Sequence, residues 1–151
     1  MLAVEHGAPH GGRLITTEPI GAGQVIARIP AARRAPRPTY RSIQIGPDAH
    51  VEDLGDLCYL NHSCRPNCAV DTETLRLVAG RDIAAGEELT YFYPSTEWEM
   101  DRPFRCLCGG PGCVGIVAGA KALPPEALRR FTLAPHIRRL LAPAPEPGGP
   151  R

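Results

Sequence analysis

With 151 residues, the chain has the length of one domain, or of one domain with small appendages, which excludes two large domains. Its 17 Pro and 16 Gly residues favour short strands joined by turns over helical bundles and coiled coils. Seventeen basic and sixteen acidic side chains give a net charge of +1, so overall charge does not favour binding to nucleic acid or a membrane. The sequence shows neither a membrane-length apolar run nor a secretory signal pattern, and we expect a cytoplasmic protein.

Brief apolar or β-branched runs, bounded by Gly, Pro or Asp, predict a mainly β core. The runs at 68–71 and 75–79 flank a short polar stretch, which indicates a β-hairpin. Two similar Gly-containing turns, at 20–26 and 83–89, each lead into a strand. The predicted strands span residues 13–17, 25–30, 40–45, 68–71, 75–79 and 88–93.

Three segments are expected to lie outside this core. Residues 31–38 carry three arginines among Ala and Pro, which predicts an exposed connector, with a substrate contact as the alternative. A Pro-Pro-Glu sequence can open a helix over 124–131, and 137–142 is a second amphipathic segment. From residue 143 onward the chain is mostly Pro, Gly and Ala, and we expect it to be disordered.

Three of the six cysteines crowd into RCLCGGPGCVG, where their spacing favours a metal site over disulfides. They are Cys106, Cys108 and Cys113. The glycines between them let three thiolates converge on one tetrahedral ion, interpreted as zinc, with a redox pair or unliganded thiols as alternatives. Cys64, in a turn before a proline, is best placed to supply a fourth ligand. Cys58 and Cys68 border strand-like residues and are expected to be buried. With four sulfur ligands the site is closed and structural.

Aromatic residues concentrate directly before these cysteines. By strand alternation, Tyr91 and Tyr93 share one face while Phe92 enters the core. The two phenols could line one wall of a site, or could be ordinary cross-strand packing with surface hydroxyls. The segment LNHSCRPN supplies several hydrogen-bonding side chains, among them Asn61 and His62, and could equally be an elaborate structural turn.

Three motifs occur in an order that resembles a known enzyme family. LNHSCRPN, GEELTYFY and CLCGGPGC are similar to segments of the SET-domain protein lysine methyltransferases with their post-SET zinc segment, and GGRLITTEPIGAGQVI resembles the family's opening strand and turn. The resemblance spans about residues 11–118 and is nearest to small bacterial members. It implies a SET-domain fold, mainly β, with small curved sheets, a pseudoknot and short C-terminal helices. The expected division is a SET core at 1–101, a post-SET zinc segment at 102–118, a helical cap at 119–142 and a disordered tail at 143–151.

The resemblance also implies an activity, which is methyl transfer from S-adenosylmethionine to a lysine amine through an aromatic channel. Tyr93 matches the family's catalytic tyrosine, and Tyr91 matches a position where Tyr restricts the space around the amine, which predicts mainly monomethylation. Cys64 is implied as the zinc ligand that joins the three post-SET cysteines. The implied cofactor-binding positions are Gly11, Gly12, Arg13, Asn61, His62, Tyr93 and Leu107.

Two positions depart from the family's pattern. Arg13 stands at a turn glycine, where it could pair with the cofactor carboxylate or point outward, and Phe92 replaces an acidic residue between the tyrosines. A SET fold that binds a peptide or the cofactor without turnover is therefore one alternative. A zinc-stabilised interaction module is another.

The partner implied by the resemblance is a lysine-containing protein or peptide. Acidic residues near the aromatic strand would favour a basic peptide if they face the groove, and would otherwise form a solvated surface. They are Asp82, Glu87, Glu88, Glu97, Glu99 and Asp101. We expect a monomer that binds neither nucleic acid nor a membrane.

Overall fold

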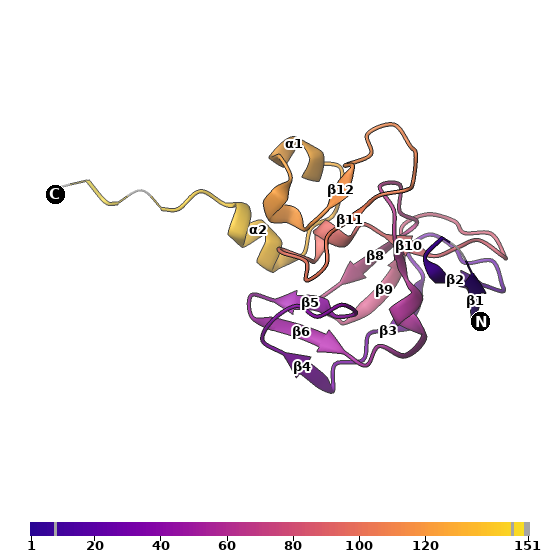
Figure 1. Cartoon of the computed structure of the whole chain (residues 1–151). Helices are drawn as coiled ribbons and strands as arrows, with labels where there is room; N and C mark the ends of the chain where they lie inside the picture. The colour runs from indigo at the N-terminus through magenta and orange to yellow at the C-terminus, as the bar shows by residue number, and fades with distance from the viewer. Residues whose placement is uncertain (8, 146, 150–151) are drawn as a thin grey trace.

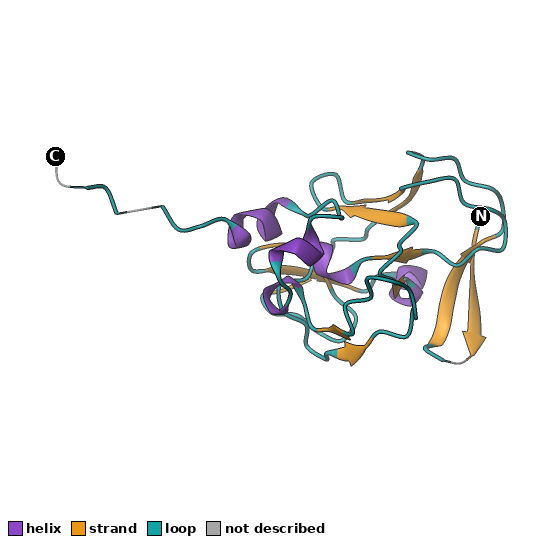
Figure 2. Cartoon of the chain, turned by 90° about the horizontal axis from the view of Figure 1, so that it is seen from above, coloured by secondary structure: helices purple, strands orange, loops and turns teal. Residues whose placement is uncertain are grey.

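The computed structural model describes residues 1–7, 9–145 and 147–149. This part of the chain forms five small sheets with only short helices (Figures 1 and 2), which confirms the mainly β fold class. The strands are β1 (Leu2–Gly7), β2 (Gly11–Thr16), β3 (Val25–Arg28), β4 (Arg33–Ala35), β5 (Ile43–Gly46), β6 (Ala49–Glu52), β7 (Asn61–His62), β8 (Cys68–Asp71), β9 (Arg76–Ala79), β10 (Thr90–Tyr91), β11 (Phe104–Arg105) and β12 (Ile116–Val117). The helices are the 3₁₀ helices η1 (Gly55–Tyr59), η2 (Tyr93–Ser95) and η3 (Ala120–Ala122), and the α-helices α1 (Pro125–Leu128) and α2 (Pro135–Leu141). No helix in this described part has the length and apolar character needed to cross a membrane.

Two antiparallel three-stranded sheets form the body of the fold. In one sheet β9 lies between β3 and β8, and in the other β6 lies between β4 and β5. The β8–β9 hairpin confirms the sequence prediction. Asp71 pairs with Arg76, and its carboxylate accepts hydrogen bonds from the backbone N–H groups of Glu73 and Thr74 at 3.0 and 3.1 Å. These bonds fix the tight turn.

Six strands escaped the sequence prediction, namely β1, β4, β6, β7, β11 and β12. Strand β4 lies within residues 31–38, which were expected to be an exposed connector. Arg33 and Arg34 are exposed as expected, but their backbone pairs with β6, and Arg33 forms a 3.3 Å ion pair with Glu52. This strand exists through backbone pairing with a neighbour, which an apolar pattern does not reveal.

The N-terminal hairpin of β1 and β2 packs against η1. Gly12 permits this contact, because a Cβ atom there would lie 2.6 Å from Cδ1 of Tyr59. The two similar Gly-containing turns pair with each other, since Ile20 and Ile83 exchange backbone hydrogen bonds of 2.9 and 2.8 Å. These contacts hold the N-terminal hairpin on the same side of the molecule as β10 (Figure 1).

Distant parts of the chain meet where β7 pairs with β10 in parallel. The strand expected over 88–93 is shorter, because the chain turns into η2 at Tyr93, with a proline in its first turn, and β10 ends at Tyr91. Phe92 nevertheless stays extended, so the predicted alternation holds. The rings of Tyr91 and Tyr93 lie 4.8 Å apart, while Phe92 packs in a separate C-terminal cluster.

The C-terminal segment has its own small core. Phe92 stacks on Phe131 with ring centroids 3.6 Å apart, and Leu128 and Ile137 are fully buried beside them. Helix α1 is shorter than the predicted 124–131, and α2 begins two residues before the predicted 137. Beyond α2, residues 143–145 and 147–149 contain neither helix nor strand. The disorder expected for 146 and 150–151 lies outside the described residues.

Candidate functional site

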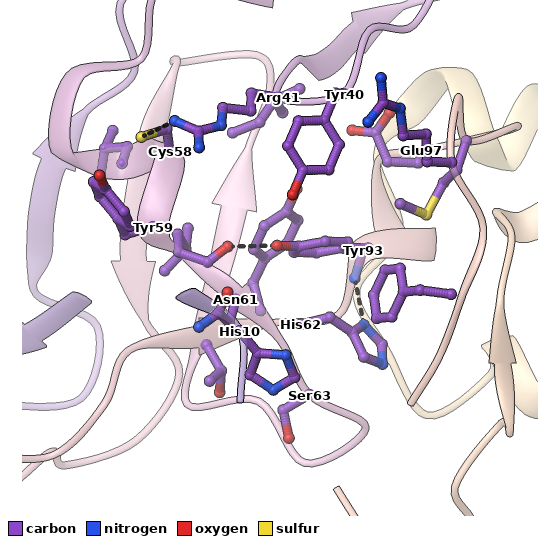
Figure 3. Close-up of a pocket in the computed structure, with 18 of the residues that line it drawn as sticks. His10, Tyr40, Arg41, Cys58, Tyr59, Asn61, His62, Ser63, Tyr93 and Glu97 are labelled. Carbon is purple, nitrogen blue, oxygen red and sulfur yellow. Dashed lines mark hydrogen bonds between the residues drawn. The ribbon is translucent and has the colours of Figure 1, made fainter. Parts of the chain in front are cut away.

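A cavity of about 850 Å³ opens at the crossing of β7 and β10, within the size range of small-molecule sites. Its walls come from the N-terminal hairpin, the loop at 38–43, η1, the aromatic segment and the cysteine-rich segment. Figure 3 shows Tyr40, Tyr59 and Tyr93 among the lining side chains. Nine of the predicted site residues line it, namely Gly11, Gly12, Asn61, His62, Tyr91, Tyr93, Leu107 and the proposed metal ligands Cys106 and Cys108. The crossing therefore brings together residues that lie far apart in the sequence.

The two predicted phenols form one wall of this cavity. The hydroxyl of Tyr93 donates a 2.7 Å hydrogen bond to the backbone carbonyl of Leu60, which holds the ring in place (Figure 3). Tyr91 is almost fully buried. Burial, followed by the nearby carboxylate of Glu97, raises the pKa of both phenols. Both are therefore neutral hydroxyl groups at physiological pH.

Asn61 and His62 face the cavity from β7. Both amide hydrogens of Asn61 are engaged, with the carbonyl of Gly12 and with Oε1 of Glu88, each at 2.9 Å. Its Oδ1 remains able to accept a hydrogen bond. Nδ1 of His62 accepts a 3.2 Å hydrogen bond from the backbone N–H of Tyr93, and burial lowers the pKa of this imidazole to about 4. The ring is thus neutral, and its proton is assigned to Nε2.

Arg13 is the predicted cofactor-binding residue that lies elsewhere. Its guanidinium pairs with Glu5 across the N-terminal hairpin at 2.6 Å, and both side chains are about half exposed. Arg13 does not line the cavity. Of the two orientations considered from the sequence, the outward one is observed, because alternating strand positions place Arg13 opposite the buried neighbour Leu14.

The four cysteines proposed as zinc ligands converge. The sulfur atoms of the set lie within 4.8 Å of one another, and the cluster comprises Cys64, Cys106, Cys108 and Cys113. Sγ of Cys64 is 3.7 Å from Sγ of Cys106, close to the roughly 3.8 Å expected between thiolates that each lie about 2.3 Å from a tetrahedral zinc ion. Burial raises the pKa of Cys64 and Cys106, so a cation is needed to hold them as thiolates. This donor set fits zinc and closes the site.

The two remaining cysteines lie outside this cluster. Cys68 is buried as expected, its thiol donates to Oδ1 of Asn67 at 3.3 Å, and burial raises its pKa to about 12. Cys58 is only half-buried and contacts Nη1 of Arg41 at 3.5 Å at the edge of the cavity. Neither position suits a ligand of the four-cysteine cluster.

The acidic residues divide into two groups. Glu88, Glu97 and Asp101 line the cavity. The other three are occupied elsewhere, because Glu87 pairs with Arg81, Asp82 accepts from the backbone of Ala22, and Glu99 pairs with Lys121. Of the two arrangements considered from the sequence, these three residues follow the surface one, and Glu88, Glu97 and Asp101 follow the groove-facing one.

Sequence reasoning missed the outer wall of the cavity. Tyr40 is 63% exposed, and the guanidinium of Arg102 lies over its ring at 4.8 Å from the centroid. Arg41 lies beside both Tyr40 and Tyr59, at 5.7 and 5.8 Å from their centroids. No sequence signal joins Tyr40 to Arg102, since only the fold brings them together.

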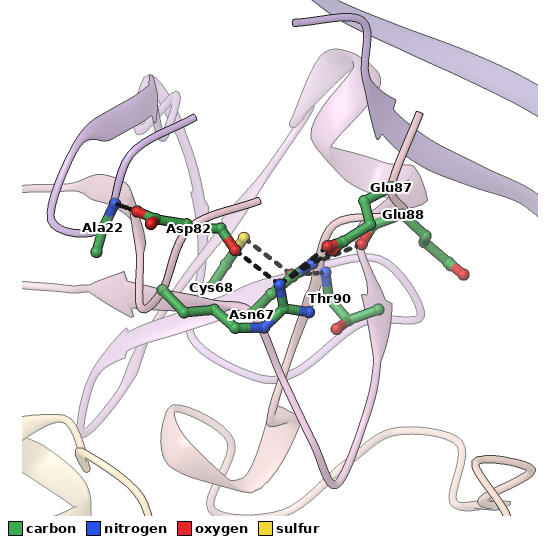
Figure 4. A network of polar contacts seen from close by, with 8 residues as sticks. Ala22, Asn67, Cys68, Asp82, Glu87, Glu88 and Thr90 are labelled. Atoms are coloured by element: carbon green, nitrogen blue, oxygen red, sulfur yellow. Dashed lines mark hydrogen bonds and ion pairs between the residues drawn. The ribbon is translucent and has the colours of Figure 1, made fainter. Parts of the chain in front are cut away.

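A second missed residue is Asn67, which ends the LNHSCRPN motif. Its buried amide donates to the carbonyl of Glu88 at 2.8 Å and accepts from the N–H of Thr90 at 2.9 Å (Figure 4). Side-chain amides can replace backbone partners in this way. Asn67 thereby fixes the start of β10 and, through it, the position of Tyr91. Its place in the motif was the available signal.

The chain is similar in sequence to known proteins. The SET domain family matches residues 11–94. The methyltransferase flvH of Aspergillus flavus is 44% identical over 123 residues, which cover 80% of this chain and 69% of that protein. The H3 lysine-36 specific histone-lysine N-methyltransferase of Aspergillus oryzae is 47% identical over 73 residues, covering 44% of this chain but only 7% of that larger protein.

Two solved structures have a fold similar to that of this chain. KRYPTONITE in complex with mCHH DNA, an H3(1–15) peptide and SAH has a TM-score of 0.58 at 26% identity, over 76% of this chain and 29% of that one. The methyltransferase domain of human SETMAR has a TM-score of 0.60 at 20% identity, over 78% of this chain and 58% of that one. The chain thus spans less than two thirds of each structure.

Proposed function

Because this chain belongs to the SET-domain family of methyltransferases, we propose that it is an S-adenosylmethionine-dependent protein lysine N-methyltransferase. The observation that carries the proposal is the meeting of Tyr93, Asn61 and the glycines at the start of β2 around one cavity beside a four-cysteine cluster. Relatives named as histone-lysine methyltransferases and a neighbour bound to an H3 peptide and SAH support a lysine-bearing substrate.

The cavity suits the cofactor. Exposed Gly11 leaves backbone accessible, and Gly12 leaves room for the Tyr59 ring. Asn61 presents a carbonyl oxygen, and the 60% exposed Leu107 offers an apolar surface. These residues, with His62, would hold S-adenosylmethionine, which supplies an electrophilic methyl group when bound. Both departures from the family pattern lie outside the cavity, since Arg13 faces solvent and Phe92 packs in the C-terminal core.

The chain's own residues would act mainly by positioning. The hydroxyl of Tyr93 donates its proton to Leu60, so its oxygen lone pairs can face the cavity and orient the reacting groups. The neighbouring aromatic rings exclude water and make a positively charged amine less favourable, which lowers the amine's pKa. A neutral amine is the form that can attack.

Tyr91 would set the number of methyl groups added. Its buried ring packs against Tyr93 and would occupy the space beside the reacting amine. A second methyl group would need the same space. Mainly monomethylation is therefore proposed.

The four-cysteine cluster would bind structural zinc. Cys64 lies in the turn that carries Asn61 and His62, while the other three ligands come from the segment that reaches the cavity with Leu107. Zinc would thus tie the C-terminal segment to the cavity wall, and with four sulfur ligands it would leave no position for substrate.

Transfer of a radiolabelled methyl group from the cofactor to lysine tests the proposed function. The protein is incubated with radiolabelled S-adenosylmethionine, core histones and a mixture of lysine-containing peptides, and methyl-lysine is identified after hydrolysis. The wild type should label lysine, and Tyr93→Phe should do so about 100-fold more slowly while still binding S-adenosylhomocysteine in calorimetry. Cofactor binding without any methyl-lysine would favour a degenerate module. Absence of cofactor binding would favour a zinc-stabilised interaction module.

A further inference from the structure

A carboxylate without a counter-ion lies in the cavity wall. Glu97 is 4% exposed and lines the same cavity as Tyr93 (Figure 3), to which Tyr91 also contributes. Its Oε1 accepts hydrogen bonds from the backbone N–H of Gln44 at 2.8 Å and from Oγ1 of Thr96 at 3.1 Å. Within the described residues no cation pairs with this carboxylate, and Oε2 has no hydrogen-bond partner.

The free oxygen is open to the cavity. Across the part of the chain that the structure describes, Nδ1 of His50 is the only side-chain polar atom that is both fully buried and unpartnered. Oε2 of Glu97 must therefore be accessible, and the cavity is the space that Glu97 lines. Its backbone is rigid, because its N–H donates to Tyr93 at 2.9 Å and its carbonyl accepts from Ala120 at 2.8 Å.

No group around Glu97 neutralises it. The titratable and charged groups on the surrounding elements are Tyr40, Arg41, His50, Tyr91, Tyr93, Asp101, Arg102 and His136. Burial lowers the pKa of both histidines, so neither is a cation at neutral pH. Burial raises the pKa of Glu97 itself to about 7, and no charged neighbour contributes to that shift. A buried carboxylate of this kind is costly unless a cation arrives to pair with it.

We propose that Glu97 binds the ammonium group of the substrate amine and takes its proton before methyl transfer. This inference rests on the proposed function of the cavity. A lysine substrate would place its primary ammonium group in this cavity. Oε2 of Glu97 is the carboxylate oxygen that is still able to accept a hydrogen bond from it. Two phenols on the same wall provide further polar contacts for the nitrogen.

The proposed proton transfer runs from the substrate ammonium group to the carboxylate of Glu97. One N–H bond of the ammonium group breaks, its electron pair stays on nitrogen, and an O–H bond forms on Oε2 of Glu97. The ammonium and carboxylate become a neutral amine and a neutral carboxylic acid. After turnover the acid returns its proton to water at the open side of the cavity. A carboxyl that titrates near neutral pH suits this exchange.

Glu97→Gln isolates the proton-accepting role, because the amide oxygen can still accept from Gln44 and Thr96. Methylation rates are measured between pH 6 and pH 10 with the peptide mixture named above. We expect kcat to fall about 100-fold at pH 7, and the deficit to shrink toward pH 10, where lysine loses its proton unaided. Glu99→Gln, an exposed control that pairs with Lys121 outside the cavity, should match the wild type. An equal deficit at every pH, or none, would overturn the proposal.

A binding measurement separates this proposal from the proposed function. Protein labelled with ¹³C at glutamate carboxyls gives a Glu97 signal that is identified by its loss in Glu97→Gln. Adding n-butylammonium chloride at pH 7.5 should shift this signal, while 1-butanol, a neutral analogue of similar size, should leave it in place. A shift in a protein that methylates nothing would support the ammonium site and contradict the enzyme. An unmoved signal in an active enzyme would contradict the ammonium site alone.

Discussion

His62 and Tyr93 are joined by a hydrogen bond that links the cysteine cluster to the aromatic wall. Nδ1 of His62 accepts the backbone N–H of Tyr93 at 3.2 Å, while Nε2 lies 3.4 Å from Sγ of Cys64. With its proton on Nε2, the imidazole donates to the sulfur. One neutral ring therefore contacts both a proposed metal ligand and the backbone of the residue that we propose as catalytic.

His62→Ala should weaken both ends of this link. The buried N–H of Tyr93 would lose its acceptor, and we expect a loss of about 1–3 kcal/mol in the free energy of unfolding, together with slower methyl transfer. Urea unfolding and initial rates measure the two effects. His62→Gln offers a replacement acceptor and should lose less of each. Equal behaviour of the alanine variant and the wild type would show that the hydrogen bond is unimportant.

Tyr91→Phe should change the product rather than the fold. Removal of the hydroxyl frees space beside the amine without changing the buried ring, so dimethyl- and trimethyl-lysine should increase at the expense of monomethyl-lysine. Mass spectrometry of a methylated peptide reads the distribution. Tyr40→Phe, at an exposed site on the outer wall, is the matched control and should keep the wild-type distribution. Trimethyl-lysine as the main wild-type product would contradict the assignment.

Loss of a ligand should release the metal and destabilise the C-terminal segment. For Cys64→Ser we expect less than one zinc per chain by elemental analysis and a fall of several kcal/mol in unfolding free energy, since structural zinc can supply about 10–16 kcal/mol. Cys58→Ser changes a cysteine outside the cluster and should retain the zinc. Full zinc content in Cys64→Ser would remove that residue from the ligand set.

Asn67→Ala should loosen β10. Two backbone partners, the carbonyl of Glu88 and the N–H of Thr90, would lose buried hydrogen bonds, at a cost of about 2–5 kcal/mol. Hydrogen exchange at Thr90 should accelerate accordingly. Arg81→Ala breaks an exposed ion pair with Glu87 in the same region and should change stability by less than about 1 kcal/mol. Similar losses in the two variants would argue against a special role for the amide.

Glu97 should make stability depend on pH. Its pKa is near 4.5 in an unfolded chain and about 7 when buried, so the folded state binds more protons between these values and loses stability as pH rises. The cost approaches about 3 kcal/mol above pH 7. Urea unfolding is measured for both proteins from pH 5 to pH 8, and Glu97→Gln should become more stable relative to the wild type as pH rises. The difference between the two free energies of unfolding cancels the titration of all other groups. A constant difference would show that Glu97 does not titrate in this range.

Much of the local structure could be predicted from residue patterns. The β8–β9 hairpin follows from two apolar runs around a polar turn, and the opposite orientation of Phe92 relative to Tyr91 and Tyr93 follows from extended backbone. Strand β4 could not be predicted, because its stability comes from pairing with β6 and not from its own apolar residues. Arg13 illustrates a different limit, since its partner Glu5 lies on a strand that the sequence did not indicate.

The sequence by itself determined the mainly β class, the spacing of the cysteines and the order of the motifs, because these depend on neighbours along the chain. Tertiary structure alone decided that Tyr40 and Arg102 form an outer wall, and that Glu97 stands in the cavity with one oxygen free. Burial and the absence of a counter-ion are properties of contacts between segments far apart in sequence. A local pattern carries no information about which carboxylate will be deprived of water and of a cationic partner.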